Sequence, residues 1–591
     1  MKDIPPASKT INNETSNIKS TEYPSPKNVT INGIDYLQSQ APIGEFGGEL
    51  IASTIGEGPK TFNPFNSKDN TSSTMAGVMY DGLLTTDPIT GQPAPKLAKS
   101  YSISTDGKTY TVKLRHGIKW SDGKPITADD VVFTWRDIIF AGLGDTSTRD
   151  SLVIDDKLPT VRKIDNYTVE FTTPKPYAPF IRMLSTSIAP KHYFLPAVKG
   201  GAETFDRFLG TTTQPKDIVV SGAFKLKEYV PAQRVVFERN PNYYEINKNN
   251  EKLPYLDKYI YLIVGDLNNE VLKFEAKELD VISLQGSKVA RYKSLEPHSD
   301  FTLYNLGPAT GTMYISMNLN NRKNDKGKYY VDPIKQKWFQ DLNFRQAVDY
   351  AIDRKNMVFN IANGIGEPLF TPESLNSIYL NKNIKPYDKN LEKSRELLKK
   401  SGFYTKKGKL YDKEGNRVEF DLYTNAGNTE REAIGVMVKQ DLEDLGMKIN
   451  FKPIEFNSLV NKLVSTFDWD MVIMGLTGSP LEPNGGKNVW LSDGRLHMFN
   501  MRSPQEGKAK ILPWEKELDE CFTKGALATK FEERKKHYDK YQEIVYEQKP
   551  FIYIYSPVII VAIRDKFKNI YPSGLSGITH NIEEIYIGSG N

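Results

Sequence analysis

The chain has 591 residues, of which 39% are hydrophobic and 11% aromatic, and a formal net charge of +5 at pH 7. This length is enough for several packed cores. Basic and acidic residues are interspersed, which argues against a nucleic-acid-binding protein, because such proteins usually concentrate positive charge on one face. Cys521 is the single cysteine, so no intrachain disulfide can form.

Residues 1–40 are rich in Ser, Thr, Asn, Pro and Lys, and their few apolar residues are isolated. Such a segment buries too little apolar surface to offset the entropy of ordering. We therefore predict a disordered tether over residues 1–40, with ordered structure beginning near Gly47. Residues 1–20 also lack the apolar segment of a signal peptide, so an exported form would already have lost its signal.

The first clear elements follow one another between residues 104 and 140. Residues 110–114 alternate polar and apolar side chains after an Asp106-Gly107 turn, which predicts a β-strand. Residues 127–130 read TADD, a capping-box pattern that predicts the start of a helix. The apolar positions of that helix share one face and are Val131, Trp135, Ile138 and Ile139.

Two further helices are predicted in the second half of the chain. One begins near Asn343 and ends by Gly364, with apolar residues at helical spacing. The other has Thr429 and Glu432 in the positions of a capping box and ends at Gly446. Helices of this kind alternate with strand patterns, which indicates an α/β protein.

The strand patterns of this half lie at residues 448–451, 471–474 and 551–563. The last is the longest apolar stretch, but Ser556 and Pro557 interrupt it. It is shorter than the roughly 18 residues of a membrane-spanning helix. We therefore predict a buried strand at this position.

Motifs for catalysis, metals and cofactors are missing. No two histidines have the spacing of metal ligands; they are His116, His192, His298, His497, His537 and His580. Gly364-Ile365-Gly366 lacks the third glycine of a dinucleotide loop, and residues 574–577 fall one residue short of a nucleophile elbow. We predict no catalytic residue, no metal site, no cofactor and no enzyme.

One stretch is highly specific. Residues 114–131 read LRHGIKWSDGKPITADDV, preceded by PKLAKSY at 95–101 and STDGKTYT at 104–111. Turns at Asp106-Gly107 and Asp122-Gly123, the aromatic anchor Trp120 and the helix cap Thr127 give it a local structural logic. It closely resembles the signature of the family 5 extracellular solute-binding proteins, the oligopeptide, dipeptide and nickel binding subunits of ABC importers.

The resemblance extends over nearly all of residues 48–590. SGAFKL at 221–226, ERNPNYY at 238–244 and FRQAV at 344–348 are similar to later segments of the same family. The resemblance implies a two-lobed α/β fold of the periplasmic-binding-protein type (type II, cluster C) with an extra domain inserted in the first lobe. The implied domains are a tether at 1–40, lobe one at 41–75, 210–312 and 551–591, the inserted domain at 76–209, and lobe two at 313–550.

The function implied by the resemblance is capture of a peptide or peptide-like solute between two lobes and its delivery to an ABC permease in the membrane. Such a protein would be an extracytoplasmic monomer, and many relatives are lipid-anchored through an N-terminal cysteine that this chain lacks. Three alternatives stay open. The same fold could bind an opine, an oligosaccharide or a metal chelate, act as a sensory receptor, or carry a hydrolase site.

The ligand-contacting residues are also carried over from the resemblance. In lobe one the contact segment comes before the YDGLL sequence at residues 80–84 and contains Asp69, Asn70 and Thr71. In lobe two the contacts come from Tyr314 and from the segment after Met474. The residues of that segment that we assign to the site are Thr477, Gly478, Ser479, Glu482, Asn488 and Trp490.

Ser479 is the informative departure from the family pattern. It stands where peptide binders have an aspartate that pairs with the ligand's α-ammonium group. A serine hydroxyl is only a neutral acceptor, so we predict that a free amine is not the main recognised group, unless Glu482 supplies the lost charge. Trp490 could form a ligand-facing wall or part of the core, and Asn488 could orient a ligand or turn the chain.

Overall fold

The computed structural model describes residues 23–324, 326–501 and 511–589, and these divide into two units. We call residues 23–283, 292–306 and 561–589 the N-terminal unit, and residues 284–291 and 307–560 the central unit. The predicted lobes had their boundaries near Gly311 to Met313 and near Pro550, so the limits of the units differ from them. The inserted domain at 76–209 falls inside the N-terminal unit and stays a prediction as a separate domain.

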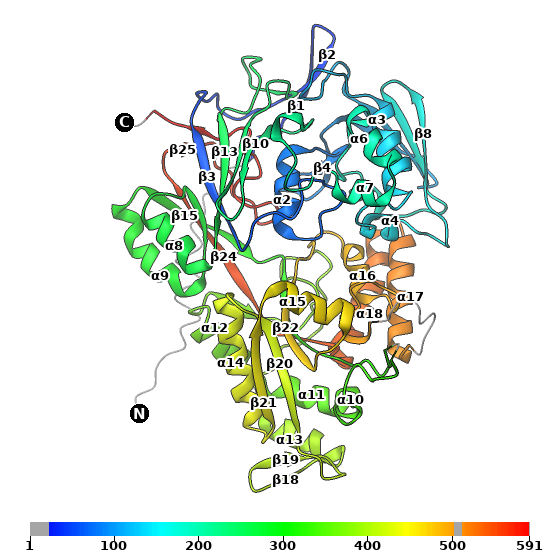
Figure 1. Cartoon of the computed structure of the whole chain (residues 1–591), viewed down its shortest axis with the longest axis vertical. Helices are drawn as coiled ribbons and strands as arrows, with labels where there is room; N and C mark the ends of the chain where they lie inside the picture. The colour runs from blue at the N-terminus through cyan, green and yellow to red at the C-terminus, as the bar shows by residue number, and fades with distance from the viewer. Residues whose placement is uncertain (1–22, 325, 502–510, 590–591) are drawn as a thin grey trace. The chain divides into compact units, whose positions relative to one another are not determined.

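The described part of the N-terminal unit contains five sheets of two to four strands and several short helices (Figure 1). Its strands are β1 (Lys27–Ile31), β2 (Ile34–Gln38), β3 (Glu49–Ile55), β4 (Leu84–Thr86), β5 (Pro93–Pro95), β6 (Ala98–Ile103), β7 (Thr109–Leu114), β8 (Thr160–Asp165), β9 (Thr168–Thr172), β10 (Phe224–Val230), β11 (Arg234–Arg239), β12 (Glu245–Ile246), β13 (Lys258–Val264), β25 (Phe567–Lys568) and β26 (Tyr586–Ile587). Its helices are α2 (Asn70–Met79), α3 (Ala128–Phe133), the π-helical η2 (Thr134–Ile139), α4 (Ser147–Ser151), α5 (Phe180–Met183), α6 (Lys191–Lys199), α7 (Ala202–Arg207), the 3₁₀ turns η3 (Pro215–Asp217) and η4 (Glu296–His298), and α8 (Leu267–Glu275). The chain passes between the units within or beside β14 (Val281–Leu284), α9 (Gly286–Leu295), β15 (Phe301–Pro308) and β24 (Tyr555–Arg564).

The signature segment of the N-terminal unit folds as predicted. The strand at 110–114 is part of β7, and Gly107 has a φ of 70° in the turn that joins β6 to β7. Thr127 caps α3, and the Asp130 carboxylate accepts a hydrogen bond from the Thr127 backbone N–H at 2.9 Å, which completes the capping box. Trp120 is fully buried, as an aromatic anchor should be.

A hairpin opens the described chain and corrects the prediction for residues 1–40. β1 and β2 pair antiparallel through a two-residue turn, and β2 pairs in parallel with β12. The predicted tether is therefore wrong for residues 27–38, while residues 1–22 lie outside the described residues. Asn32 and Gly33 both have positive φ in this turn. An Asn-Gly pair is a strong hairpin signal that outweighs the polar composition around it.

The partners of the hairpin come from distant parts of the N-terminal unit. The buried Arg115 donates from Nη1 to Asn28 Oδ1 at 2.8 Å and to the Tyr36 carbonyl at 3.2 Å. Lys99 forms an ion pair with Asp35 at 2.8 Å. Because these contacts are made only in the folded unit, the composition of residues 1–40 could not reveal them.

Deleting residues 1–40 should destabilise the protein, whereas deleting residues 1–22 should not. The longer deletion removes two acceptors of the buried Arg115, and hydrogen bonds to charged groups contribute about 1.5–3 kcal/mol each. At about 2–4 °C per kcal/mol, we expect the melting temperature to fall by roughly 5 °C or more. Differential scanning calorimetry of the two truncations measures this. Equal melting temperatures would show that the hairpin contributes nothing.

The central unit is built around one five-stranded sheet (Figure 1). Its strands are β16 (Thr312–Met317), β17 (Gly366–Pro368), β18 (Tyr404–Lys406), β19 (Lys409–Tyr411), β20 (Glu419–Asn425), β21 (Lys448–Ile454), β22 (Met471–Leu476) and β23 (Phe551–Tyr553). Its helices are α10 (Pro333–Gln340), α11 (Leu342–Ala351), α12 (Arg354–Asn360), α13 (Leu391–Lys400), α14 (Thr429–Glu443), α15 (Phe456–Asn461), the π-helical η5 (Lys462–Thr466), the 3₁₀ turns η6 (Pro483–Gly486) and η7 (Met498–Asn500), α16 (Lys487–Trp490), α17 (Pro513–Leu527) and α18 (Phe531–Gln548).

The predicted elements of this unit are confirmed, with two corrections. The strands at 448–451 and 471–474 lie in β21 and β22, and the apolar stretch 551–563 forms β23 and β24. The helix predicted from Asn343 to Gly364 is two helices, α11 and α12. The cap of α14 is Asn428 rather than Thr429, and Glu432 accepts instead from the Gly427 N–H at 2.8 Å. Asparagine caps a helix as well as threonine does, so the cap lies one residue earlier than predicted.

The strand order of the large sheet reverses at β20. The order is β21-β20-β22-β16-β23, in which β20 is parallel to both β21 and β22, and β16 is antiparallel to β22 and β23. The chain leaves β20 through α14 to reach β21 on one side, and then returns through α15 to β22 on the other side. The carboxyl ends of β20 and β22 therefore lie next to each other at a topological switch point.

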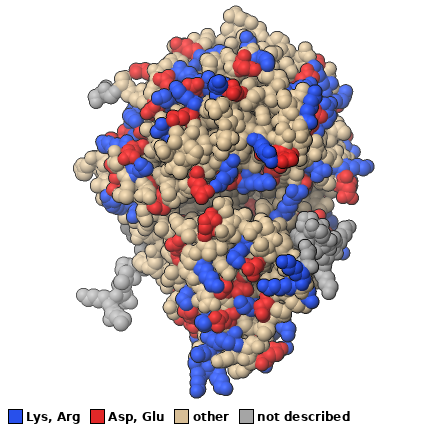
Figure 2. All heavy atoms as spheres, in the orientation of Figure 1, with Lys and Arg blue, Asp and Glu red and all other residues tan. Residues whose placement is uncertain are grey.

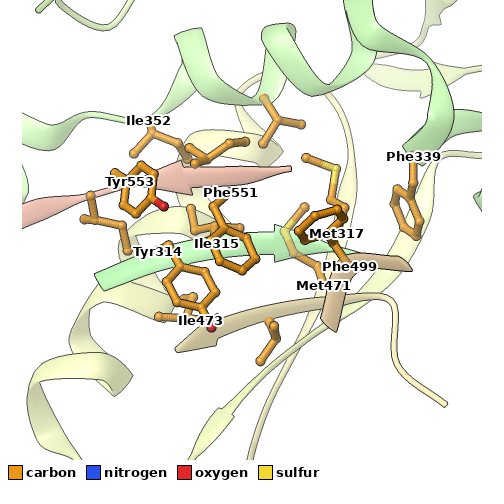
Figure 3. Packing of buried hydrophobic residues seen from close by; sticks show 14 of the residues in the cluster. Tyr314, Ile315, Met317, Phe339, Ile352, Met471, Ile473, Phe499, Phe551 and Tyr553 are labelled. Carbon is orange, nitrogen blue, oxygen red and sulfur yellow. The ribbon is translucent and has the colours of Figure 1, made fainter. Parts of the chain in front are cut away.

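Side chains of β16, β22 and β23 form the middle of the core of this unit (Figure 3). Ile315 and Met317 on β16 lie near Met471 and Ile473 on β22, and all four are buried. The rings of Tyr314 and Phe551 stack with a centroid distance of 3.9 Å. Burial of each such side chain contributes about 1.5–3 kcal/mol, so this core holds the strand ends of the switch point in place.

Candidate ligand-binding site

The carboxyl ends of β20 and β22 define the candidate site of the central unit. In open α/β sheets, ligands bind outside the carboxyl ends of the strands where the strand order reverses. The chain leaves β20 at Asn425 toward α14, and leaves β22 at Leu476 toward residues 477–490. The segment predicted to contact the ligand in lobe two therefore begins at the switch point.

Thr477, Gly478 and Ser479 are exposed and follow β22 directly. Outside the strand ladders, their backbone groups make no hydrogen bond to the part of the chain that the structure describes. The Ser479 hydroxyl accepts only from the Leu481 N–H, at 3.3 Å. This segment offers neutral backbone groups and hydroxyls, and no carboxylate, to a ligand.

Tyr314 lies on β16 beside this edge, but its side chain is fully buried. Its ring packs against Phe551, and its hydroxyl has no hydrogen-bond partner among the described residues. Burial raises the pKa of Tyr314, and the Arg431 guanidinium opposes that shift. Because neither the ring nor the hydroxyl of Tyr314 is exposed, its role in ligand contact stays a prediction.

Glu482 has a structural partner. Its side chain is 8% exposed, and both carboxylate oxygens accept from Nη2 of Arg534, at 2.6 and 2.8 Å. Burial opposes the charged form of Arg534, but the Glu482 carboxylate outweighs it and raises the pKa of Arg534. Glu482 is thus buried and paired with Arg534, and its role at a ligand amine stays a prediction.

Asn488 and Trp490 lie on α16 in the same loop. Trp490 is 5% exposed and packs on Phe551 and Tyr541, with ring centroids 5.3 and 5.7 Å apart. It therefore belongs to the core side of the loop. Asn488 is half-buried, and its carbonyl accepts from the Leu496 N–H at 3.0 Å, so its backbone holds the loop together. Phe551 links Trp490 to Tyr314 in one aromatic cluster.

The three candidates of the N-terminal unit lie at the start of α2. Asp69 is the cap of this helix, and its carboxylate accepts from the backbone and the hydroxyl of Ser72 at 2.8 and 2.7 Å. Asn70 is exposed in the first turn, and the Thr71 hydroxyl lies 3.0 Å from that of Thr54. Asp69 and Thr71 thus have structural contacts, which leaves Asn70 the most accessible of the three. Their role in ligand contact stays a prediction.

Arg431 is a residue that the sequence reasoning missed. It lies in the first turn of α14, directly after β20, and its Nη1 donates to Asn425 Oδ1 at 2.8 Å. Its Nη2 would lie 2.7 Å from a Cβ at Gly475, so the guanidinium packs directly over that glycine of β22. The available signal in the sequence was an arginine at the start of the helix that follows a strand. This position indicates a site residue only when the strand order of the sheet is known.

A metal-binding cluster and a membrane-spanning helix are both missing from the described residues. No group of three or more His, Cys, Asp and Glu side chains among them has the placement to hold a metal ion. Within the same residues, no helix has both the length and the apolar character needed to cross a membrane. On the visible face, Lys and Arg side chains are interspersed with Asp and Glu (Figure 2).

Comparison with known proteins agrees with this geometry. Residues 92–496 match the bacterial extracellular solute-binding proteins, family 5 (middle region). A probable ABC transporter-binding protein of Deinococcus radiodurans is 32% identical over 538 residues, which cover 87% of each chain. The chain therefore belongs to the family 5 bacterial extracellular solute-binding proteins.

Solved structures show the same fold. The oligopeptide-binding protein AppA of Bacillus subtilis, in complex with a nonapeptide, is 25% identical with a TM-score of 0.74, over 93% of this chain and all of that chain. The periplasmic binding protein MelB of Agrobacterium fabrum, in complex with stachyose, is 21% identical with a TM-score of 0.79, over 94% of this chain and 87% of that one. The predicted two-domain periplasmic-binding-protein fold is confirmed.

Proposed function

We propose that the protein is the extracytoplasmic substrate-binding subunit of an ABC importer, which captures a peptide or peptide-like solute and delivers it to a membrane permease. Family membership supports this proposal, as do a relative named as an ABC transporter-binding protein and the nonapeptide complex of AppA. The observation that carries it is the exposed segment 477–479 at the carboxyl end of β22.

An exposed strand end suits an extended peptide. Backbone groups of the segment can pair with the ligand backbone and give affinity without reading its sequence, while water-filled surroundings accept varied side chains. Such a mechanism requires binding and release but no bond cleavage, and we therefore propose a carrier rather than an enzyme. We further propose that the protein acts as a monomer and that its mature form is held at the cell surface by a lipid anchor.

A peptide ligand should raise the melting temperature of the purified protein. A ligand that binds only the folded state adds about 2.7 kcal/mol at 100 times its dissociation constant. We expect this shift with a mixture of synthetic peptides of two to nine residues, and native mass spectrometry should show the bound peptides. Stachyose is the matched comparison, because the MelB structure has the same fold. A rise in melting temperature with stachyose and none with peptides would contradict the peptide proposal and show that the solute is an oligosaccharide.

A further inference from the structure

Positive charge is concentrated at one end of the central unit, where β18 and β19 form a hairpin (Figure 1). We call residues 399–413, which run from the end of α13 through this hairpin, the basic tip. They contain six lysines, all exposed, and one acidic residue, Asp412. Asp412 is buried and accepts a hydrogen bond from Nε1 of Trp338 at 2.9 Å. The exposed charges of the basic tip are therefore all positive, and Figure 2 shows Lys and Arg side chains at this end.

The lysines of the basic tip lack counter-ions within the described residues. Those that form no ion pair there are Lys399, Lys400, Lys406, Lys407 and Lys409. The nearby acids have other partners: Glu396 pairs with Lys393 at 3.3 Å, and Glu414 lies 3.9 Å from Lys413. Lys406 and Lys409 stand directly opposite each other in the hairpin, and like charges in that position are destabilising. An anionic partner would remove this repulsion.

The hairpin has a fixed shape without any partner. Lys407 and Gly408 have φ of 52° and 73°, and a two-residue turn with two positive φ values suits the twist of a hairpin. Its base is held by Leu410, which is buried and whose backbone N–H donates to the Gly446 carbonyl at 2.8 Å. The lysines are therefore presented together on a folded element, and the folded chain supplies no anion for them.

The side chains of the basic tip fit a lipid surface better than a protein partner. Lysine is depleted at protein–protein interfaces, and a stable interface needs about 1,000 Å² with an apolar centre. β18 and β19 have only three residues each, and Tyr404 is the one exposed aromatic residue of the basic tip. Clustered lysines are attracted to anionic headgroups, and tyrosine is enriched where a bilayer meets water.

We propose that the exposed lysines of the basic tip bind an anionic lipid surface. The partner is a bilayer whose phosphate headgroups carry net negative charge, and the contact is made by the ammonium groups at its surface. This inference goes beyond the proposed function, because it adds a membrane contact of the central unit that does not depend on which solute is captured. The attraction acts over about 10 Å at 0.1 M salt, so the basic tip must lie at the headgroups.

The test is co-sedimentation of the full chain with lipid vesicles at low salt. Vesicles of phosphatidylglycerol and phosphatidylcholine in equal parts are compared with vesicles of phosphatidylcholine alone. Each lysine near an anionic surface strengthens binding roughly fivefold, so we expect a preference for the anionic vesicles of roughly a hundredfold or more. Salt at about 1 M, where the Debye length is about 3 Å, should abolish this preference. Soluble glycerol phosphate at the same headgroup concentration should not displace the protein.

Variants assign the effect to the basic tip. The test variant combines Lys406→Gln, Lys407→Asn and Lys409→Gln. An Asn-Gly pair favours the same turn, so the hairpin is kept. We expect binding to the anionic vesicles to fall roughly fiftyfold. The matched control removes the same charge from exposed positions of α17 and α18 and combines Lys516→Gln, Lys536→Gln and Lys540→Gln. It should leave the binding nearly unchanged, and urea midpoints show that both variants are folded.

Three results would overturn the inference. Equal binding to the two kinds of vesicle shows that the lysines do not recognise an anionic surface. Equal losses in the test variant and the control show that net charge acts and the basic tip does not. Displacement by glycerol phosphate shows a site for a free phosphate group in place of a membrane contact. Peptide binding is measured on the same variants and should be unchanged, so a wild-type protein that binds vesicles but no peptide contradicts only the proposed function.

Discussion

Replacing Asp349 with Asn should destabilise the central unit more than any other single change considered for this protein. Asp349 lies on α11, is 1% exposed, and forms ion pairs with Lys549, at 2.6 Å, and with Arg354. Tyr387 also donates its hydroxyl to this carboxylate. Arg354 donates in turn to the Tyr553 carbonyl at 2.7 Å, so the network ties α11 and α12 to β23.

The expected loss in the free energy of unfolding is about 3–5 kcal/mol, because the change leaves two buried cations without a carboxylate. Urea unfolding followed by tryptophan fluorescence measures it. Asp388→Asn is the matched control, since its ion pair with Lys355 is about two-thirds exposed and such pairs contribute about 0–1 kcal/mol. Equal losses in the two variants would show that the buried network contributes no more than a surface pair.

The same carboxylate predicts a dependence of stability on pH. Burial alone would raise the pKa of Asp349, but Lys549 and Arg354 outweigh it and lower the pKa to about 2, from an ordinary value of 3.8. A carboxyl group with a lowered pKa stabilises the folded state above its unfolded pKa, and this stabilisation is lost as the pH falls through the folded pKa. The difference corresponds to about 2 kcal/mol, lost between about pH 4 and pH 2. Asp349→Asn should remove this part of the acid dependence.

Replacing Glu482 with Gln should have the second-largest effect. The change leaves the buried Arg534 guanidinium without its carboxylate, at an expected cost of about 3–5 kcal/mol. Arg534 lies on α18 and also donates to the Tyr379 hydroxyl at 2.9 Å, so the pair anchors the loop that begins at Ser479. Urea unfolding again gives the measurement. Glu520→Gln, in an exposed pair with Lys524, is the control and should be indistinguishable from the wild-type protein.

A second readout separates this structural role from ligand contact. If Glu482 served a ligand amine, Glu482→Gln would change the ratio of affinities for free and N-acetylated peptides. We expect the ratio to stay the same in the folded variant, while the stability falls. A changed ratio with unchanged stability would restore Glu482 to the ligand site and contradict the ion pair with Arg534.

Local signals were sufficient for much of the fold. The capping box at Thr127, the alternation in β7 and the apolar pattern of β22 depend on residues within about one helical turn or one strand, where sequence neighbours are also spatial neighbours. The Asn32-Gly33 turn is also a local signal, and it was sufficient to predict the hairpin of residues 27–38. The family signature at 95–131 likewise identified the fold, because it consists of such local elements in a fixed order.

The sequence by itself thus determined which segments are helices or strands, which family the chain belongs to, and that a neutral residue stands at position 479. The tertiary structure alone decided which distant residues meet. Glu482 pairs with Arg534, 52 positions away, and the hairpin of residues 27–38 is held by Arg115. Arg431 became a site residue only when the strand order placed β20 beside β22. The physical reason is that capping and periodicity act over a few residues, whereas burial and charge pairing depend on how the whole unit packs.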